Sequence, residues 1–322
     1  MGVNLKDIVP YRQIEFDELK GKTIAVDALN TLYQFLASIR QPDGTPLMDT
    51  QGNVTSHLAG LMYRTGRLLR MGIRPVYVFD GTPHPLKKTE LDRRKKLKEE
   101  SQTKWDEAKQ AGRLDEARKY AQRTGRLTKE MTADARTLLS LMGVPYVEAP
   151  GEGEAQCAYM VQKGDAWASA SQDYDSILFG APRLIRNLTL TGQLELQLVE
   201  LAETLKQTEA TREQLVDAAI LAGTDFNEGV FGIGPKKGLK VAREGKTSEQ
   251  DVGAPLDDVR AIFLTPNVTD KYDINWGKLD ENKLVAFLNG EHQFSENRVR
   301  TTAHEIQKAL NEQTQQNLNK WF

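Results

Sequence analysis

Short apolar segments alternate with longer amphipathic segments through the first half of this 322-residue chain. The short segments are rich in Val, Ile and Ala and are bounded by turn residues, which indicates buried strands. They are residues 22–27, 74–80, 144–149 and 166–170. The longer segments carry apolar residues at helical spacing, and they are residues 29–40, 55–71, 129–142 and 154–163. This order predicts an α/β fold with a central, mostly parallel sheet flanked by helices.

Two segments depart from this alternation. Residues 86–130 hold 15 Lys or Arg against 9 Asp or Glu, with too few apolar residues to cover a core, so we expect inserted helices that project from the body. After Asp225 the strand pattern gives way to helices, with a loop rich in Gly, Ser and Asp near 245–258 and a last helix near 295–312.

Acidic residues follow each expected strand at the point where the strand ends. Ligands bind beyond the carboxyl ends of parallel strands, so acids far apart in the sequence are expected to meet in one crevice. Two acidic pairs are spaced i, i+2, and extended backbone would point both carboxylates of a pair to one side. A further acid, in AGTDFN, follows a helix expected to begin near Thr211. The candidates are Asp27, Asp80, Glu152, Glu154, Asp173, Asp175 and Asp225.

Carboxylates gathered in one crevice repel one another and need cations between them. The chain has one cysteine, Cys157, in an apolar helical stretch expected to lie in the core, and four histidines without metal-ligand spacing, so oxygen atoms must supply the ligands. Oxygen ligands favour magnesium, with manganese as the alternative. Two such ions in a carboxylate site catalyse phosphodiester hydrolysis in nucleases. Taken singly, the acids also have structural explanations as helix caps, turn residues or favourable charges at a helix start.

Basic residues follow Asp80 closely, with seven against two acidic residues at positions 87–98. If this segment is helical, Lys87, Arg94 and Lys98 share one face. Beside a metal crevice, such a face attracts a phosphate backbone and stabilises charge on the scissile phosphate. A solvated charged helix is the alternative.

The sequence GIGPKKGLK at residues 232–240 combines glycines, a proline and lysines. Its spacing is not that of a dinucleotide-binding loop, and no expected strand precedes it. The proline suits the first turn of a helix, and the helix amides together with the lysines can hold a phosphate. This predicts a sequence-independent grip on duplex DNA, with a plain helix-start turn as the alternative. The residues are Gly232, Gly234, Lys236, Lys237 and Lys240.

The overall charge does not favour nucleic-acid binding. The formal net charge is −2 and the pI is about 6.2, whereas a basic nucleic-acid-binding domain has a pI above about 9. The argument for such binding therefore rests on the local clusters. No apolar stretch approaches the roughly 18 residues of a spanning helix, and the N-terminus lacks the apolar run of a signal peptide. We expect a cytoplasmic protein that has no targeting signal and no contact with membranes.

The motifs VDALN, VFDGTPHPLK, GEGEAQ, SQDYDS, AGTDF and GIGPKKG, in this order and spacing, closely resemble the flap endonucleases of the structure-specific 5′-nuclease family. The resemblance spans nearly the whole chain. It implies a sheet-centred nuclease domain with a helical arch, a helix-two-turn-helix-like region that binds duplex DNA, and two magnesium ions. The implied activity is cleavage of 5′ flaps on branched DNA during replication and repair, with associated 5′-3′ exonuclease activity.

The resemblance also assigns roles to individual residues. The seven acids match the family's metal-binding residues, and Lys87 and Arg94 match arch residues that contact the scissile phosphate. Tyr33 matches an aromatic that stacks on a base, although spacing alone favours simple packing. Gly2 matches the residue that becomes the amino terminus near the site once Met1 is removed.

The last eight residues, QQNLNKWF, resemble a sliding-clamp-binding box. It begins at Gln315, and one helical turn would bring Leu318, Trp321 and Phe322 to one face that can enter an apolar pocket. The chain stops at this box, which resembles the archaeal form of the family. We therefore expect a monomer, associated with the nucleoid of an archaeon, that binds a sliding clamp.

The expected organisation is one globular nuclease domain with five regions. The regions are an N-terminal nuclease region at 1–85, an arch at 86–130, an internal nuclease region with the duplex-binding turn at 131–245, a helical region at 246–312 and a clamp-binding tail at 313–322.

Other functions remain open: a relative that prefers exonucleolytic digestion, a single-strand ribonuclease with a similar acidic sheet, and a non-catalytic clamp-binding DNA scaffold.

Overall fold

The computed structural model describes residues 3–189 and 195–318, and side chains as far as residue 312. Within these residues a seven-stranded sheet has the spatial order β1-β7-β6-β5-β2-β3-β4. The strands from β6 to β4 in that order are parallel, and β7 and β1 add an antiparallel edge. The expectation of a mostly parallel sheet in an α/β fold is confirmed. The strands are β1 (Arg12–Ile14), β2 (Thr23–Asp27), β3 (Arg74–Phe79), β4 (Tyr146–Glu148), β5 (Ala168–Ala170), β6 (Arg183–Arg186) and β7 (Leu196–Glu200).

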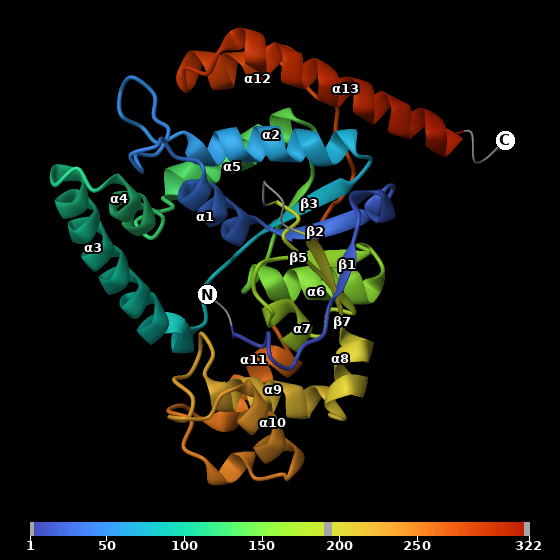
Figure 1. Ribbon diagram of the computed structural model, residues 1–322. Coiled ribbons are helices and arrows are strands. Elements are labelled where there is room, and N and C mark those ends of the chain that lie inside the picture. The colour runs from blue at the N-terminus through green and yellow to red at the C-terminus, as the bar shows by residue number, and fades with distance from the viewer. Residues whose placement is uncertain (1–2, 190–194, 319–322) are drawn as a thin grey trace.

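Helices cover both faces of the sheet because its central strands are apolar on both sides. In β2, Ile24 and Val26 belong to the core cluster on one face, whereas Ala25 belongs to the cluster on the other. This alternation follows from the period of two along a strand. The first face packs against α1 (Ala28–Ser38), α2 (Ser56–Arg70), α5 (Lys129–Leu141), α12 (Glu281–Val285) and α13 (Glu296–Leu318). The second packs against α6 (Gly153–Lys163), where Cys157 is buried as expected (Figure 1).

Several expectations about the elements were incomplete or wrong. Strands β1, β6 and β7 were not predicted; β1 and β7 join the sheet only through antiparallel pairs. The last helix continues past the predicted residue 312 to Leu318. Thr55 precedes α2 as expected, but its side chain makes no capping hydrogen bond because its backbone is already helical.

The inserted segment forms two helices, α3 (Lys88–Gln110) and α4 (Leu114–Ala121), that stand beside the body (Figure 1). Gly112 separates them with a φ of +68°, a value that favours glycine. In the long α3 only Ser101 and Ala108 are buried. We call α3, α4 and the preceding short helix η2 (Pro85–Lys87) the arch.

A second group of helices lies at the other end of the molecule (Figure 1). Helices α9 and α10 pack closely, and a Cβ added at Gly238 would lie 2.7 Å from the carbonyl oxygen of Ala218. Within the described residues, no helix is long and apolar enough to cross a membrane. This group comprises α7 (Asp175–Leu178), α8 (Leu201–Thr208), α9 (Arg212–Ala222), α10 (Pro235–Arg243) and α11 (Leu256–Leu264).

Candidate metal and nucleic-acid site

The acids at the ends of β2 and β3 are fixed by backbone amides. Asp27 ends β2 and caps α1, where its Oδ1 accepts a hydrogen bond of 3.0 Å from the amide of Asn30. Asp80 follows β3, and its Oδ1 accepts a bond of 2.8 Å from the amide of Gly153. A Cβ on Gly153 would lie 2.5 Å from this oxygen, so the turn between Glu152 and Glu154 requires glycine. The structural explanation of Asp27 as a cap is thus correct as well.

The i, i+2 pairs do not lie on extended backbone, so that part of the prediction was wrong. Glu152 is the N-cap of α6 and Glu154 lies in its first turn, so their side chains diverge. Asp175 begins α7, whereas Asp173 lies in the preceding loop. A helix start turns successive residues by about 100°, which sends Glu152 toward the arch and Glu154 toward the interior.

The seven acids nevertheless surround one region, as the mutual effects on their pKa values show. Burial, and then the charge of Asp80, raises the pKa of Asp27 well above its usual range. Burial and Glu152 raise the pKa of Asp80 to about 6. Burial and Asp173 raise the pKa of Asp175 to about 7.

Glu154 has one carboxylate oxygen without a hydrogen-bond partner among the described residues. This oxygen, Oε1, is buried. Burial, and then Asp175 and Asp27, raises the pKa of Glu154 well above the usual range. A buried carboxylate oxygen without a partner destabilises the fold unless a bound ligand supplies that partner. An all-oxygen donor set of this kind suits a hard divalent cation. The residues present therefore fit magnesium.

The acids encircle the region without converging on a single point. In the part of the chain that the structure describes, no three Asp, Glu, His or Cys side chains are close enough to form a ready metal-binding group.

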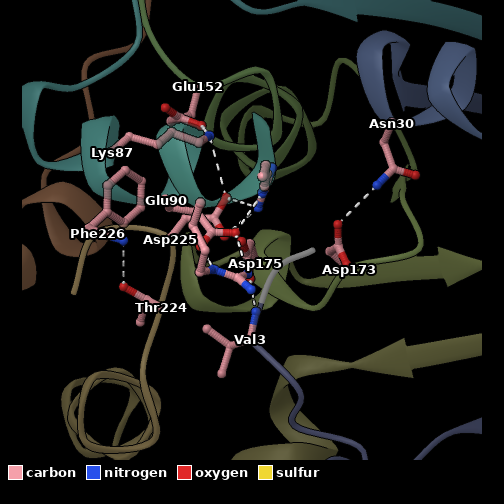
Figure 2. A network of polar contacts seen from close by, with 12 residues as sticks. Val3, Asn30, Lys87, Glu90, Glu152, Asp173, Asp175, Thr224, Asp225 and Phe226 are labelled. Carbon is pink, nitrogen blue, oxygen red and sulfur yellow. Dashed lines mark hydrogen bonds and ion pairs between the residues drawn. The ribbon is translucent and has the colours of Figure 1, made fainter. Parts of the chain in front are cut away.

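Two cations from the arch, Lys87 and Arg94, contact the acids, and Figure 2 shows Lys87 beside Glu152 and Asp225. Lys87 forms an ion pair with Glu152, and its Nζ lies 3.7 Å from Oδ2 of Asp225. Although burial lowers the pKa of Lys87, Glu152 and Asp225 raise it overall, so its ammonium stays charged. Arg94 Nη2 donates to both carboxylate oxygens of Asp225, at 2.6 and 2.7 Å. Lys87 precedes α3 instead of lying on it, yet it reaches the same acid as Arg94.

Tyr33 and Lys98 lie side by side between α1 and the arch. The Lys98 ammonium is 4.5 Å from the centre of the Tyr33 ring, which remains 39% exposed. Burial lowers the pKa of Lys98 and raises that of Tyr33. A half-exposed ring beside a cation can still meet a base, so the structure is compatible with the predicted stacking role.

The GIGPKKG segment is separate from the acids. Gly234 caps α10 and Pro235 occupies its first turn, as predicted. Lys236, Lys237 and Lys240 are exposed, and the Lys237 ammonium lies 3.2 Å from the carbonyl oxygen of Gly232. Helix α10 lies on the far side of α9 from the sheet, so it can serve only a part of a ligand that extends well beyond the acids (Figure 1).

Three further residues contact the site but were not predicted. Asn30 Nδ2 donates to Asp173 Oδ2 at 3.0 Å, and the amide of Val3 donates to Asp175 Oδ1 at 3.0 Å (Figure 2). Glu90 accepts from Arg94 Nε at 2.6 Å. The i, i+4 spacing of Glu90 and Arg94, and the position of Asn30 three residues after a capping acid, were the available sequence signals. No local pattern indicated Val3.

Several predicted residues fall at the two ends of the chain. Gly2, Trp321 and Phe322 lie outside the described residues. Gln315 and Leu318 belong to α13, but their side chains also lie outside what is described. Their roles remain predictions.

Two family models match the chain: an XPG N-terminal domain over residues 1–101 and an XPG I-region over residues 143–225. The flap endonuclease 1 of Methanothermobacter thermautotrophicus is 50% identical over 330 residues, covering 100% of both chains. That of Pyrococcus horikoshii is 49% identical over 338 residues, covering 100% of this chain and 98% of the relative.

Two solved structures have a similar fold. The flap endonuclease-1 from Methanococcus jannaschii superposes with a TM-score of 0.81 at 42% identity, covering 97% of this chain and 99% of that one. The catalytic core of Rad2 in complex with a DNA substrate shares the fold, with a TM-score of 0.71 at 24% identity over 92% of this chain and 96% of that one.

The fold is thus that of the structure-specific nucleases, a class of phosphodiester hydrolases that includes metal-dependent enzymes of DNA replication and repair. Within that class the chain belongs to the flap endonuclease 1 family and has its 5′ flap endonuclease activity. The sequence resemblance is confirmed.

Proposed function

We propose that the seven acids hold two magnesium ions and that the enzyme hydrolyses a phosphodiester near the junction of single strand and duplex. The observation that carries this proposal is Glu154, whose buried Oε1 lacks a partner inside a ring of acids with raised pKa values. Magnesium bound here would stabilise charge on the scissile phosphate and lower the pKa of the attacking water; manganese would serve in the same way. The ligands are Asp27, Asp80, Glu152, Glu154, Asp173, Asp175 and Asp225.

The arch residues position the substrate. Lys87 and Arg94 are held at the crevice by Glu152 and Asp225. If Glu152 and Asp225 bound metal ions, the ammonium of Lys87 and the guanidinium of Arg94 would be released from these ion pairs. Both cations could then contact the scissile phosphate. Tyr33 stacks on an unpaired base, and Lys98 beside it contacts the single strand.

The remaining contacts lie outside the crevice. Gly232, Gly234 and the lysines of α10 grip the phosphates of the duplex arm. Gly2 becomes the amino terminus once Met1 is removed, and we assign it a contact with the DNA. The protein is further proposed to be a monomer in an archaeal cytoplasm. It binds a sliding clamp through Gln315, Leu318, Trp321 and Phe322. It also has 5′-3′ exonuclease activity at recessed ends.

Asp173→Asn tests the metal assignment. We expect single-turnover cleavage of a labelled double-flap DNA with magnesium to fall at least about 1000-fold, because roughly 4 kcal/mol of stabilisation is lost from the transition state. Flap binding should survive. Asp257→Asn, at an acid whose side chain is 93% exposed on α11, is the matched control. Near-normal turnover of Asp173→Asn would defeat the assignment.

Lys87→Ala and Lys236→Ala separate the two basic sites. Lys87→Ala should slow the chemical step more than it weakens binding, since Lys87 lies among the acids. Lys236→Ala should weaken duplex affinity and reduce its salt dependence, with little effect on the step itself. Single-turnover rates and binding isotherms at several salt concentrations measure both. If each variant changed the single-turnover rate and the DNA affinity equally, the assignment of Lys87 to the chemical step and of Lys236 to duplex binding would be contradicted.

A further inference from the structure

Phe231 is the most exposed large apolar side chain in the described part of the chain. Its relative accessibility is 105%, and the next most exposed, Tyr11 and Leu114, show 54%. An aromatic ring in water forgoes the free energy that burial would supply. A ring held so far out of the protein calls for an explanation.

The turn around Phe231 keeps the ring outside. Val230 and Ile233, on either side, pack against the core cluster of α9 and α11. The amide of Ile233 donates to the carbonyl of Val230 at 3.0 Å, and the amide of Val230 donates to the carbonyl of Leu221 at 2.8 Å. Gly232 has a φ of +76°, which completes a four-residue turn with Phe231 at its tip. Because both anchors point inward, the tip points to solvent.

Positive charge borders this ring. The Lys237 ammonium lies 3.2 Å from the carbonyl oxygen of Gly232, the residue next to Phe231. Lys236 and Lys240 are exposed on the same short helix, which begins at Pro235, three residues after Gly232. Glu228 is the exposed acid nearest in sequence. An exposed apolar ring beside a helix that carries three exposed lysines complements a polyanion that also presents apolar surface.

We propose that Phe231 contacts the duplex arm of the substrate, with its ring against the deoxyribose edges that line the groove beside the phosphates gripped by α10. The inference rests on the duplex grip proposed above for α10. Paired bases are stacked and closed to a ring at the tip of a turn, whereas sugar edges are apolar and present at every step. Such a contact adds affinity that depends neither on sequence nor on salt.

Duplex binding as a function of salt tests the inference. With a blunt DNA duplex and fluorescence anisotropy, Phe231→Ala should weaken affinity about five-fold at every salt concentration, because half-burial of one ring is lost and no counterions are involved. Phe231→Leu should fall between wild type and Phe231→Ala. Lys236→Ala should instead lower the salt slope by about one. Tyr63→Ala, at a 36% exposed ring on α2 far from α10, should bind like the wild type.

The outcomes separate this inference from the duplex grip. Wild-type affinity in Phe231→Ala, with weakened binding in Lys236→Ala, overturns the role of the ring and leaves the grip intact. Wild-type affinity in Lys236→Ala overturns the grip itself. A reduced salt slope in Phe231→Ala would show that the turn merely positions the lysines. Loss of self-association in sedimentation, with DNA affinity unchanged, would assign the ring to a contact between copies of the chain.

Discussion

Asp175 is buried and Glu154 is partly buried with its Oε1 fully enclosed, and burial makes the ionised forms of both acids unfavourable. A structural role alone would not retain such residues, since buried acids without compensation destabilise the fold. The ion pairs of Lys87 and Arg94 compensate Glu152 and Asp225 but leave the interior acids without a cation among the described ion pairs. At the scale of single residues, the site is therefore poised for added positive charge.

His57 is a buried ionisable group that the catalytic proposal does not use. Neither of its ring nitrogens has a hydrogen-bond partner among the described residues, and burial, with a smaller effect of His292, lowers its pKa to about 4. The unfolded chain binds this proton below a pKa near 6.5, whereas the folded protein does not. The contribution of neutral His57 to the free energy of unfolding is thus fully present above about pH 6.5 and declines as the pH falls toward 4.

His57→Leu should remove this pH dependence. We expect the free energy of unfolding of the wild type to lose about 3 kcal/mol relative to the variant between pH 7 and pH 4. Urea denaturation at several pH values measures the difference. His304→Gln, at a histidine whose side chain is 88% exposed, should leave the wild-type curve unchanged. A parallel loss in His57→Leu would refute the assignment.

At the scale of elements, polar contacts hold the arch to the body at its base and at its far part, and the contact of Lys98 with Tyr33 lies between them. Its base is held by Lys87 and Arg94, and its far part meets the loop around Gly44. There the Lys109 ammonium lies 3.0 Å from Asp43 and Trp105 Nε1 donates to the Asp43 carbonyl at 3.4 Å. Few apolar contacts mean that the arch should open locally at low free energy.

Gly44→Ala should detach the far part of the arch. Gly44 has a φ of +85°, and its Cβ would lie 2.7 Å from the Cβ of Ala121. Overpacking of about 1–3 kcal/mol should speed amide exchange in α4 by roughly 10- to 100-fold, while β2 and β3 stay protected. Gly52→Ala is the control, because its φ of +84° brings the same backbone strain with nothing within 4 Å. Equal effects of both variants would attribute the change to backbone strain.

At the scale of the whole molecule, the acids connect parts of the chain that belong to different cores. Asp27 follows Val26 of the core beneath α1 and α2, and Asp225 precedes Phe226 of the core around α9 and α11. A ligand shared by these acids therefore links both ends of the fold.

Magnesium should consequently stabilise the entire protein. At about 100 times its dissociation constant, a ligand specific for the folded state adds about 2.7 kcal/mol. We expect the midpoint of thermal unfolding to rise when magnesium chloride is added to metal-free protein, and to rise less in Glu154→Gln. Potassium chloride at matched ionic strength is the control for screening. An equal rise with potassium chloride would count against a specific site.

Local sequence patterns determined the main parallel strands, most of their helices, and the acids that end the strands. Such features depend on residues that are neighbours along the chain. Examples are the alternation of the two buried faces in β2, the left-handed cap at Gly164 and the capping box at Thr211. Because parallel strands share an edge, the gathering of Asp27, Asp80 and Asp173 was also predictable.

Tertiary structure alone decided the partners within the site. Lys87 meets Glu152 across 65 positions and Arg94 meets Asp225 across 131, and no periodicity encodes such pairs. The antiparallel edge formed by β1 and β7 likewise depends on contacts distant in sequence, as does the packing of Val230 and Ile233 that anchors the Phe231 turn. The physical reason is that periodicity reports which face of an element is buried, whereas charge pairing and exposure are settled only when the elements pack.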